Sequence, residues 1–372
     1  MKILQLGKFY PIRGGVEKVM YDLMLGLSAA QISCDMLCAS TEDHPGETLQ
    51  INDFARVFIM PTIIGLAATK IAPAMISTLK RIAPDYDVVH VHHPDPMAAL
   101  ALLLSGYKGK VVLHWHSDIL KQKMLLKVYS PLQNWLIKRA DRIVGTTPVY
   151  VKESNFLQNV QAKVTYLPIG VEPLVADMHK VQAIKETFAS KKIIFSLGRL
   201  VEYKGYAYLI EAMQYLPADY QLLIGGKGPL QQELENLIDE LGLREKVTML
   251  GFVADQDVAA YYAAASLFCL PSIMKTEAFA IVQIEAMSFG KPIVCTKIPG
   301  SGVAWVNEDG VSGLHAAVAD AQDLADKIKA IGEDQEKYTQ LSQGAQQRYE
   351  NFFTRERMTA SCLRIYEDLW KV

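Results

Sequence analysis

The chain has 372 residues, of which 50% are hydrophobic and 21% are charged, an ordinary composition for a folded soluble protein. A net charge of -2 argues against a general nucleic-acid binder, which would be strongly basic, and the length favours two domains. Residues 1–170 carry 18 Lys and Arg against 13 Asp and Glu (+5), which leaves 20 against 27 (-7) for residues 171–372. The first half is therefore the part expected to meet an anionic surface.

The sequence contains no evident signal for export or for insertion into a membrane. Its first residues lack the apolar core of a signal peptide, and no stretch approaches the roughly 20 apolar residues that span a bilayer. Five cysteines form no CxxC pair and are expected to be structural thiols in a reducing compartment. We therefore expect a cytoplasmic protein, either free or peripheral on the inner face of the cell membrane.

Short β-type runs alternate with helical patterns along the first half of the chain. The helical patterns include Val16–Ala30 and Pro94–Ser105, and several strand runs are continuously apolar, as in strands covered on both faces. This alternation predicts βαβ units and a parallel sheet. The expected strands are Lys2–Gly7, Asp35–Ala39, Arg56–Met60, Val88–His92, Lys110–His114, Arg142–Thr146 and Lys163–Leu167.

A second strand series predicts a second domain. We expect an α/β protein with two Rossmann-like domains, residues 1–170 and 171–353, whose parallel sheets face each other across a cleft. Pro and Gly cluster at the expected hinge, residues 167–173, and an amphipathic tail follows from residue 354 to 372. Ligands bind beyond the carboxyl ends of parallel strands, so functional residues are expected just after strands. The second series is Ile193–Leu197, Gln221–Ile224, Lys246–Leu250, Leu267–Leu270 and Ile293–Cys295.

Two strand-end loops of the first half carry candidate residues. Gly14 and Gly15 precede a helix whose free backbone N–H groups would suit an anion, although a plain turn explains the pair as well. In "HWHSD", His116 and Asp118 are expected to lie where a strand ends. His114 and His116 share one face of that strand and could bind a metal, but no further Cys or His cluster is expected to complete such a site.

Cations follow the first strand of the second half. In "GRLVEYKG", Arg199 and Lys204 would suit a diphosphate, with the arginine as a fork and the lysine as a compact charge. A solvated basic loop is the alternative. The position of this loop favours diphosphate binding over a solvated loop, because it follows the first strand of the second half as the Gly14–Gly15 loop follows the first strand of the first half.

Two carboxylates lie in the nearly apolar run "TEAFAIVQIEAM". Burying Glu277 and Glu285 is costly unless each has a partner. We expect a loop as far as Ala280 and a helix from about Ile281 to Ser288. Glu277 would then project from the loop, Glu285 would lie two turns along the helix, and free N–H groups would lie between them. That order of groups suits a sugar, a diphosphate and a ribose.

The stretch "PSIMKTEAFAIVQIEAMSFGKPIV" resembles the Glu-x7-Glu segment of retaining family 4 glycosyltransferases, which have the GT-B fold and include enzymes that build bacterial surface polysaccharides. That family also has a Gly-Gly loop after its first strand, a strand-end His, an Arg-x4-Lys loop, a GxGP turn and a GF turn. Matches to these features occur in family order between residues 7 and 313. They are Gly14 and Gly15, His116, Arg199 and Lys204, Gly226 to Pro229, and Gly251 with Phe252.

The resemblance implies transfer of a hexose from a nucleotide diphosphate sugar with retention of configuration. Arg199 and Lys204 would neutralise the leaving diphosphate. Glu285 would bind the ribose and His116 would contact the donor sugar near the reacting carbon. The donor sugar would also be held by Glu277 and the backbone N–H groups of Phe279 and Ala280. The remaining binding positions implied are Gly14 and Gly15 at the phosphate, Phe252 and Val253 against the base, Gly228, and Ile281 at the helix start.

Some positions depart from the family pattern. Ala278 and Ala280 stand where Gly is frequent, and Ile169 stands where the hinge usually has Asn. Alanine restricts positive φ, so the form of the sugar pocket is open at this point. No DxD constellation follows a strand, and we therefore expect neither a metal nor a cofactor beyond the donor substrate.

Two other functions compete with transfer. A sugar-nucleotide epimerase of the same fold would release product without an acceptor, and a two-lobed periplasmic sugar-binding protein would need export. For a transferase, overall resemblance favours GDP-mannose, with UDP-hexoses close behind, and a saccharide or lipid-linked oligosaccharide as acceptor. Residues 121–142 could dock on an anionic membrane or form a solvated helix with a core face. Their cations are Lys121, Lys123, Lys127, Lys138, Arg139 and Arg142.

Overall fold

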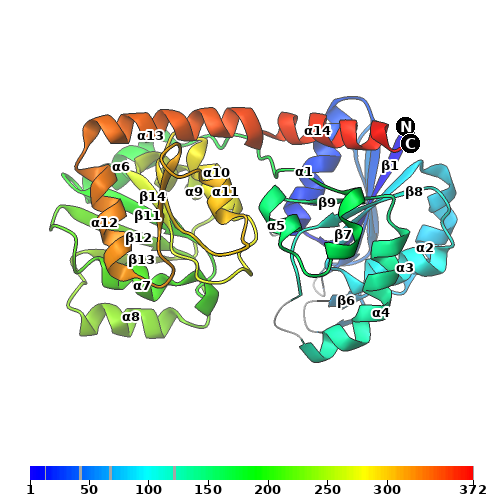
Figure 1. Ribbon diagram of the computed structural model, residues 1–372, viewed down its shortest axis with the longest axis horizontal. Coiled ribbons are helices and arrows are strands. Elements are labelled where there is room, and N and C mark those ends of the chain that lie inside the picture. The colour runs from blue at the N-terminus through cyan, green and yellow to red at the C-terminus, as the bar shows by residue number, and fades with distance from the viewer. Residues whose placement is uncertain (13, 42–43, 67–68, 120–122, 372) are drawn as a thin grey trace. The chain divides into compact units, whose positions relative to one another are not determined.

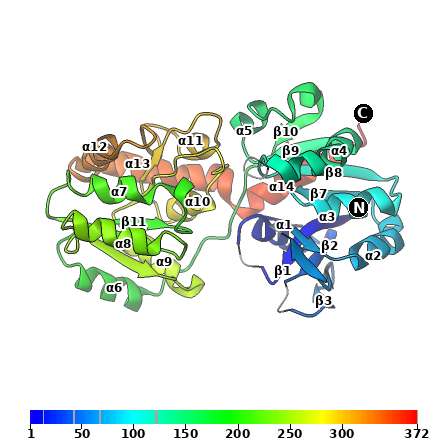
Figure 2. The same cartoon turned by 90° about the horizontal axis from the view of Figure 1, so that it is seen from below.

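The chain divides into two compact units. The computed structural model describes residues 1–12, 14–41, 44–66, 69–119 and 123–371. Unit 1 comprises Met1–Gly170 with Arg355–Val372, and unit 2 comprises Val171–Thr354. The division after Gly170 falls within residues 167–173, where the sequence predicts the hinge. In each unit helices cover both faces of a twisted sheet (Figures 1 and 2).

Unit 1 is built on an eight-stranded sheet with the order β10-β9-β8-β7-β1-β2-β4-β3 among the described residues. All neighbours pair in parallel except β3 and β4, which are antiparallel. The central strands are buried along most of their length, which explains their continuous apolar runs. The strands are β1 (Lys2–Tyr10), β2 (Ser33–Ser40), β3 (Glu47–Asn52), β4 (Ala55–Met60), β7 (Val88–His93), β8 (Lys110–Trp115), β9 (Arg142–Gly145) and β10 (Val164–Tyr166), with a separate hairpin of β5 (Ile64–Leu66) and β6 (Thr69–Ile71).

The C-terminal helix belongs to unit 1, where it packs on the first helix (Figure 1). Close approach requires a glycine at this contact, because a Cβ on Gly26 would lie 2.0 Å from Oγ1 of Thr359. The amphipathic tail therefore buries its apolar side against residues from the other end of the chain. The helices of unit 1 are α1 (Val16–Ala29), α2 (Ala74–Ile82), α3 (Pro96–Ser105), α4 (Lys123–Arg139), α5 (Pro148–Lys152) and α14 (Arg355–Asp368), with 3₁₀ turns η1 (Ala83–Asp85) and η2 (Gln158–Lys163).

Unit 2 has a six-stranded, wholly parallel sheet with the order β13-β12-β11-β14-β15-β16 among the described residues. The strands are β11 (Lys192–Leu197), β12 (Tyr220–Gly225), β13 (Val247–Gly251), β14 (Leu267–Leu270), β15 (Ile293–Thr296) and β16 (Gly313–Ala316). The helices and short turns are α6 (Met178–Thr187), η3 (Glu202–Lys204), α7 (Tyr206–Ala212), α8 (Gln231–Glu240), α9 (Asp255–Ala264), α10 (Ile281–Met287), α11 (Val303–Val306), α12 (Ala321–Gly332), α13 (Gln335–Arg348) and the π-helical turn η4 (Tyr349–Phe353).

The points at which the chain enters and leaves unit 2 are tied together. The N–H of Val171 donates to the carbonyl of Phe353 at 2.9 Å, and the Tyr349 hydroxyl donates to the carbonyl of Val171 at 2.9 Å. The two connections between the units, near residues 171 and 353, are therefore hydrogen-bonded to each other.

Candidate active site

The predicted site residues of unit 2 lie in the loops that follow β11, β12, β13 and β14, four neighbouring strands of its sheet, and in α10 after the last of these loops. Two of these loops are bonded to each other. The N–H of Gly198 donates to the carbonyl of Gly225, and that of Leu200 donates to the carbonyl of Lys227, both at 3.0 Å. A Cβ on Gly228 would lie 2.2 Å from the Leu200 carbonyl oxygen, so this predicted position requires glycine for packing.

Arg199 and Lys204 occupy different environments on the loop after β11. Arg199 is exposed, and its guanidinium has no hydrogen bond or ion pair with the described residues. Lys204 is buried, and its Nζ lies 2.5 Å from Oε2 of Glu277. The same Glu277 oxygen accepts a hydrogen bond from the Ser272 hydroxyl at 2.9 Å. The two residues assigned to the diphosphate and the sugar therefore form one buried ion pair, which sequence reasoning did not foresee.

The Glu-x7-Glu segment has the local structure that its sequence predicts. Residues 271–280 form an irregular loop, and α10 begins at Ile281. Ala280 adopts φ 65°, a left-handed conformation that favours glycine, although it carries a Cβ. The N–H groups of Phe279, Ala280 and Ile281 donate to no acceptor among the described residues. The loop thus presents donors beside the buried carboxylate of Glu277.

Glu285 lies on α10 and is half-buried. Its Oε2 accepts a hydrogen bond from the hydroxyl of Tyr262, a fully buried residue of α9, at 2.9 Å. Burial, reinforced by the carboxylate of Glu285, raises the pKa of Tyr262 well above its ordinary value, so the phenol stays a donor. This contact fixes the direction of the Glu285 carboxylate.

An exposed aromatic side chain follows β13. Phe252 is 66% exposed, and the Nζ of Lys227 lies 5.8 Å from its ring centroid. Val253, the next residue, packs near Gly225, since a Cβ on that glycine would lie 3.0 Å from a Val253 methyl group. A flat apolar ring beside a cation is a suitable surface for a nucleobase.

In unit 1, Gly14 and Gly15 precede α1, as predicted. Their φ values are 119° and 62°, and a Cβ on Gly14 would meet no other atom within 4 Å. The space beside Gly14 is therefore open on that side. Gly15 is the N-cap residue of α1 and brings no capping side chain, while the Glu17 carboxylate of the first turn accepts a hydrogen bond from its own backbone N–H.

Lys8 belongs to the same strand end, and sequence reasoning missed it. It is buried in a left-handed conformation with φ 60°; its Nζ donates to the carbonyl of Pro94 and its N–H to Oδ2 of Asp95. Burial lowers its pKa, against the opposing effect of Asp95 and Glu17. The available signal was a lysine directly after the strand glycine Gly7.

His116 lies just beyond β8, next to a histidine cluster that bears on the expectation that no further Cys or His cluster completes a metal site. The pairing of β7 with β8 sets His92 opposite His114 and brings His90 beside them. The four rings, including that of His116, are nearly parallel to their neighbours, with centroids 3.9 to 5.3 Å apart. The two motifs come together only because of strand register, which the sequence pattern does not specify.

Three histidines of this cluster lie close enough together to be compared with a metal site. Ring nitrogens of His90, His92 and His114 lie within 4.8 Å of one another. Nitrogens that share one zinc ion at about 2.1 Å lie roughly 3.4 Å apart, and each lone pair lies in the plane of its ring. Stacked rings do not direct their lone pairs to a common point, and both nitrogens of His92 already have hydrogen-bond partners. Among the described residues His114 has no hydrogen-bond partner at either ring nitrogen, and His90 has none at Nε2. The stacked geometry nevertheless fits a ligand set poorly, so we assign no metal to it.

Asp118 has a structural position. Its Oδ1 accepts hydrogen bonds from Nε1 of Trp115 at 2.8 Å and from the Ser154 hydroxyl at 2.7 Å, and its N–H donates to the Tyr150 hydroxyl. These contacts hold the segment after β8 against α5 and the loop that follows α5. His116, by contrast, has one ring nitrogen, Nδ1, without a hydrogen-bond partner among the described residues.

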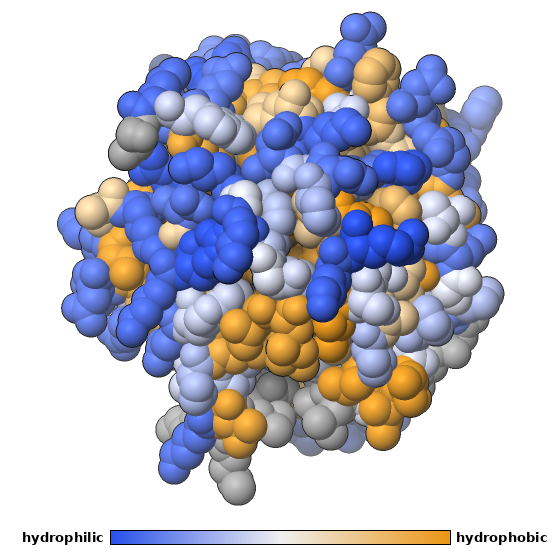
Figure 3. All heavy atoms as spheres, turned by 90° about the vertical axis from the view of Figure 1, so that its right-hand side faces the viewer, coloured by the Kyte–Doolittle hydropathy of each residue, from blue (hydrophilic) through white to orange (hydrophobic). Residues whose placement is uncertain are grey.

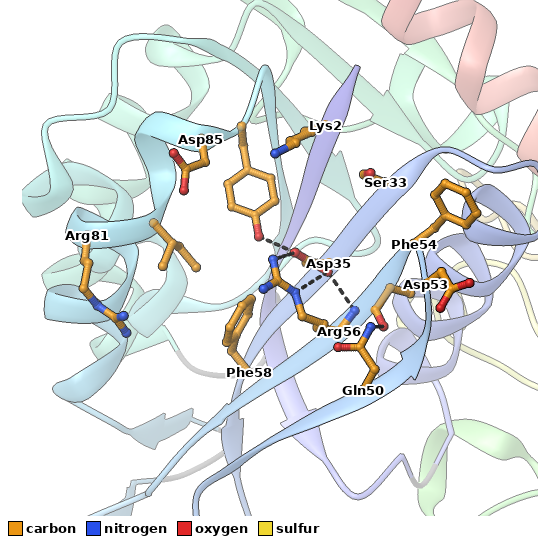
Figure 4. Close-up of a pocket in the computed structure, with 13 residues that line it drawn as sticks. Lys2, Ser33, Asp35, Gln50, Asp53, Phe54, Arg56, Phe58, Arg81 and Asp85 are labelled. Carbon is orange, nitrogen blue, oxygen red and sulfur yellow. Dashed lines mark hydrogen bonds and ion pairs between the residues drawn. The ribbon is translucent and has the colours of Figure 1, made fainter.

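A polar cavity of about 550 Å³ opens in unit 1 where β1 and β2 begin, at the edge opposite the strand-end loops (Figure 4). Asp35 lies within it and accepts hydrogen bonds from Arg56 at 2.7 Å and from the Tyr86 hydroxyl (Figure 4). Its central charges therefore neutralise each other. None of the predicted site residues lines this cavity, and we assign no substrate to it.

Within the basic segment 121–142, Lys123–Arg139 form α4 and Arg142 begins β9. Lys121 lies outside the described residues, whereas Lys127 and Lys138 are exposed. Arg139 donates to the carbonyl of Gly109 at 2.6 Å, so this cation has a structural partner. Val128 is 81% exposed. No helix among the described residues is long and apolar enough to cross a membrane. Figure 3 shows apolar patches among polar side chains on one face of unit 1.

Comparison with known proteins places this geometry in a family. The model of Glycosyltransferase Family 4 matches residues 13–173, and that of Glycosyl transferases group 1 matches residues 177–348. The chain belongs to the GT-B glycosyltransferases. This glycosyltransferase is 29% identical to O-antigen chain mannosyltransferase C of Escherichia coli, over 99% of both chains. It is also 29% identical to a D-rhamnosyltransferase of Pseudomonas aeruginosa, over 95% of this chain and 92% of that protein.

Solved structures share the fold of this glycosyltransferase. Sucrose-phosphate synthase of Thermosynechococcus elongatus superposes with a TM-score of 0.79 at 20% identity, over 100% of both chains. Anabaena HepE in complex with UDP-glucose gives a TM-score of 0.74 at 21% identity, also over 100% of both chains. The predicted fold of two Rossmann-like domains is thereby confirmed.

Proposed function

We propose that this glycosyltransferase transfers a hexose, with mannose as the first choice, from a nucleotide diphosphate sugar to a saccharide or lipid-linked oligosaccharide during synthesis of a bacterial surface polysaccharide. The observation that carries the proposal is the gathering of Arg199, Lys204, Glu277 and Phe252 on neighbouring strand ends of unit 2. The names of its relatives support the substrate class, since they act in O-antigen and rhamnose transfer. HepE binds UDP-glucose on the same fold.

The diphosphate of the donor would bind at Arg199 and Lys204. Arg199 is exposed and can turn its planar fork to two phosphate oxygens. Lys204 carries three N–H donors, of which Glu277 engages part, so it can hold a phosphate oxygen without breaking the ion pair. As the bond to the sugar breaks, negative charge grows on the diphosphate and both cations stabilise it.

The sugar would lie against Glu277 and the free N–H groups of the following loop. Glu277 is held by Lys204 and Ser272, so its carboxylate is oriented to accept hydrogen bonds from sugar hydroxyls. A carboxylate paired in this way is a poor nucleophile. We therefore propose retention without a covalent enzyme intermediate, in which the leaving diphosphate takes the proton of the acceptor hydroxyl on the same face.

We also propose that transfer needs neither a metal ion nor a further cofactor. The cations that neutralise the diphosphate are side chains of the loop after β11. Transfer assayed after dialysis against EDTA should keep its rate, and adding Mg²⁺ or Mn²⁺ should not raise it. A rate that collapses with EDTA and returns with one of these ions would contradict this part of the proposal.

The nucleobase would stack on Phe252, and GDP is the favoured nucleotide. A thermal-shift panel with GDP, UDP, ADP and their hexose conjugates tests this choice. At 100 times Kd a ligand adds about 2.7 kcal/mol to the free energy of unfolding, so the correct base should raise the unfolding midpoint clearly above the others. A panel in which no nucleotide shifts the midpoint would contradict donor binding itself.

The competing functions gain no support from the relatives, which carry transferase names. A sugar-nucleotide epimerase would convert the donor without an acceptor. Incubation of the protein with its donor alone should therefore leave the sugar nucleotide unchanged, whereas addition of an acceptor should release the nucleoside diphosphate. Isomerised sugar nucleotide in the absence of acceptor would favour the epimerase.

For a lipid-linked acceptor we propose that α4 docks on an anionic membrane. Exposed Lys127 lies beside exposed Val128, a pairing that suits an interface of headgroups and acyl chains. Charge reversal at Lys121, Lys123 and Lys127 should reduce sedimentation with vesicles that contain phosphatidylglycerol while sparing transfer to a soluble acceptor. Lys185→Glu, at an exposed position of unit 2, is the matched control. Unchanged sedimentation of the triple variant would refute docking through α4.

A further inference from the structure

A chain of hydrogen bonds runs through the interior of unit 1 from the C-terminal helix to His116. Nε2 of Gln5 donates to the Tyr366 hydroxyl at 3.2 Å, and Oε1 of Gln5 lies 2.7 Å from Nε2 of His92. Nδ1 of His92 lies 2.8 Å from Nε2 of His116. All four side chains are buried, and His116 retains 5% exposure. The chain links β1, β7 and α14 to the strand end that follows β8.

The direction of each proton follows from the chemistry of the groups. The Gln5 carbonyl oxygen can only accept, so Nε2 of His92 must carry a proton. A neutral imidazole carries one N–H, so Nδ1 of His92 is bare and must accept from His116. Nε2 of His116 is therefore protonated and its Nδ1 is bare. Burial lowers the pKa of both histidines well below the ordinary value, which keeps them neutral at physiological pH.

The orientation of the Gln5 amide is set by its other neighbours. Its Nε2 donates to the Tyr366 hydroxyl and also approaches Sγ of Cys34 at 3.7 Å. The Tyr366 hydroxyl, which accepts a hydrogen bond from Gln5, lies 2.6 Å from Nδ1 of His90 and can donate a hydrogen bond to that nitrogen. If the amide turned over, every proton along the chain would reverse. The chain keeps this direction when the Tyr366 hydroxyl donates to His90 and therefore accepts from Gln5, so we infer that Tyr366 acts as the group at its far end.

We infer that the bare nitrogen of His116 is accessible from the strand end. It has no hydrogen bond to the described residues, and it is absent from the fully buried polar atoms that lack a partner. After burial and the neighbouring histidines, Lys8 lowers the pKa of His116 further, as it also does for His92 and His93. An acceptor without a protein partner at this edge can bind a hydroxyl of a ligand.

We propose that Tyr366, Gln5 and His92 are positioning residues that hold His116 as the Nε2–H tautomer, so that its Nδ1 accepts a hydrogen bond from a sugar hydroxyl. His116 then orients the substrate as a neutral acceptor and donates no proton to the leaving group. The sugar as ligand rests on the proposed hexosyl transfer. The tautomer does not, because it is a property of the protein without ligand.

Two-bond ¹H–¹⁵N correlation spectra of histidine-labelled full-length protein test the tautomer without any substrate. The protonated and bare nitrogens of a neutral ring differ widely in ¹⁵N shift, and loss of a signal set in His116→Phe assigns the ring. The expected spectrum shows His116 protonated at Nε2 only. A ring protonated at Nδ1 would overturn the proposal, whether or not the protein transfers hexose.

A variant that lacks only the hydroxyl oxygen of Tyr366 tests whether Tyr366 sets the His116 tautomer. Tyr366→Phe should let the Gln5 amide turn over and produce a second set of His116 signals. Tyr129→Phe is the matched control, since the Tyr129 hydroxyl is buried in the same unit, lacks a partner and is not part of the chain. Identical His116 spectra for the two variants would show that Tyr366 has no positioning role. Circular dichroism confirms that both variants fold.

A conservative pair separates positioning from general packing in the transfer assay. Gln5→Leu removes the acceptor for His92 and should lower kcat/KM by roughly tenfold, the expected effect of one lost hydrogen bond. Gln5→Glu retains an acceptor oxygen and should recover most of that loss. Equal losses in the two variants, at equal unfolding midpoints, would contradict the proposal. Absence of any transfer by the unmodified protein would instead contradict the proposed function.

Discussion

The two units place polar groups at the same kind of strand edge but neutralise them in opposite ways. In unit 2 a buried ammonium and a buried carboxylate, Lys204 and Glu277, cancel each other's charge at 2.5 Å. In unit 1 the buried histidines lose their protons, because burial lowers the pKa of each ring. One edge is therefore built on an ion pair, and the other combines a stack of neutral histidines with buried Lys8.

Each edge suits a different kind of chemical group in the ligands that we propose. A diphosphate gains most from cations in a site that excludes water. A sugar hydroxyl needs a directed acceptor, and a neutral imidazole nitrogen provides one without attracting phosphate. If this comparison is correct, charge changes should act mainly through unit 2, and proton uptake should act mainly through unit 1.

The largest effect should follow removal of the cations of unit 2. Arg199→Gln with Lys204→Gln should lower kcat by at least about 10³-fold, because each lost electrostatic donor is worth roughly 3 kcal/mol in the transition state. Steady-state assays of donor turnover measure this loss. An unchanged kcat would contradict the ionic role of this edge.

A loss of fold must be separated from a loss of catalysis in that experiment. Lys204→Gln leaves a buried carboxylate without its partner and should destabilise the protein by about 3–5 kcal/mol. Arg199→Gln changes an exposed side chain and should leave the unfolding midpoint in place while lowering kcat. Combining Lys204→Gln with Glu277→Gln removes both charges and should recover much of the lost stability without recovering activity.

Acid should weaken unit 1 before unit 2. The folded pKa values of His93 and His114 are lowered from 6.5 to about 3, and those of His90, His92 and His116 are also lowered. Below pH 6.5 the unfolded chain binds more protons than the folded chain. Stability is therefore complete above pH 6.5 and falls toward pH 3, at roughly 1.4 kcal/mol per histidine and pH unit.

Hydrogen exchange resolves this prediction by region. Protection of peptides from β7 and β8, corrected for the intrinsic effect of pH, should fall by several kcal/mol between pH 7.5 and 5.5, whereas peptides from β11 and β12 should change less. Equal losses in the two sheets would contradict the assignment of neutral buried histidines to unit 1.

A moderate effect is expected at the aromatic side chain after β13. Phe252→Ala should weaken the binding free energy of the donor nucleotide by about 1–3 kcal/mol, the usual contribution of one base stacked on an aromatic ring, and so raise its Kd. Isothermal titration with the preferred nucleoside diphosphate measures it. Because Phe252 is 66% exposed, the unfolding midpoint should stay unchanged, and an unaltered Kd would place the base elsewhere.

The smallest effect concerns the backbone beside Glu277. Ala280 adopts φ 65°, where a Cβ is disfavoured by about 1–2 kcal/mol. Ala280→Gly should therefore raise the free energy of unfolding by about 1 kcal/mol in urea denaturation, less the greater freedom of glycine in the unfolded chain. Ala278→Gly is the control, because Ala278 is not left-handed and should lose stability. A destabilised Ala280→Gly would contradict strain at this loop.

The sequence predicts those parts of the fold that depend on local pattern. The apolar runs of the central strands mark their positions, and the start of α10 at Ile281 follows from the change of period after a loop. The edge strand β3 was missed because its residues are mostly exposed, and β5, β6 and β16 are too short to show a period. β1 also continues to Tyr10, beyond the expected end at Gly7.

The contacts that complete the candidate site depend on tertiary structure. The Lys204–Glu277 pair joins loops after different strands, and the histidine chain requires the register of β7 against β8. Tyr366 reaches Gln5 from the opposite end of the sequence. Residue type and strand-end position predict which side chains are candidates. They do not predict which candidates contact one another.

The most direct test of the account is the structure of the protein with its donor nucleotide bound. We predict that the diphosphate contacts the Arg199 guanidinium and Nζ of Lys204. The base should lie on Phe252, and Glu277 should keep its contact with Lys204. A diphosphate bound away from both cations would contradict the assignment of unit 2 as the donor site.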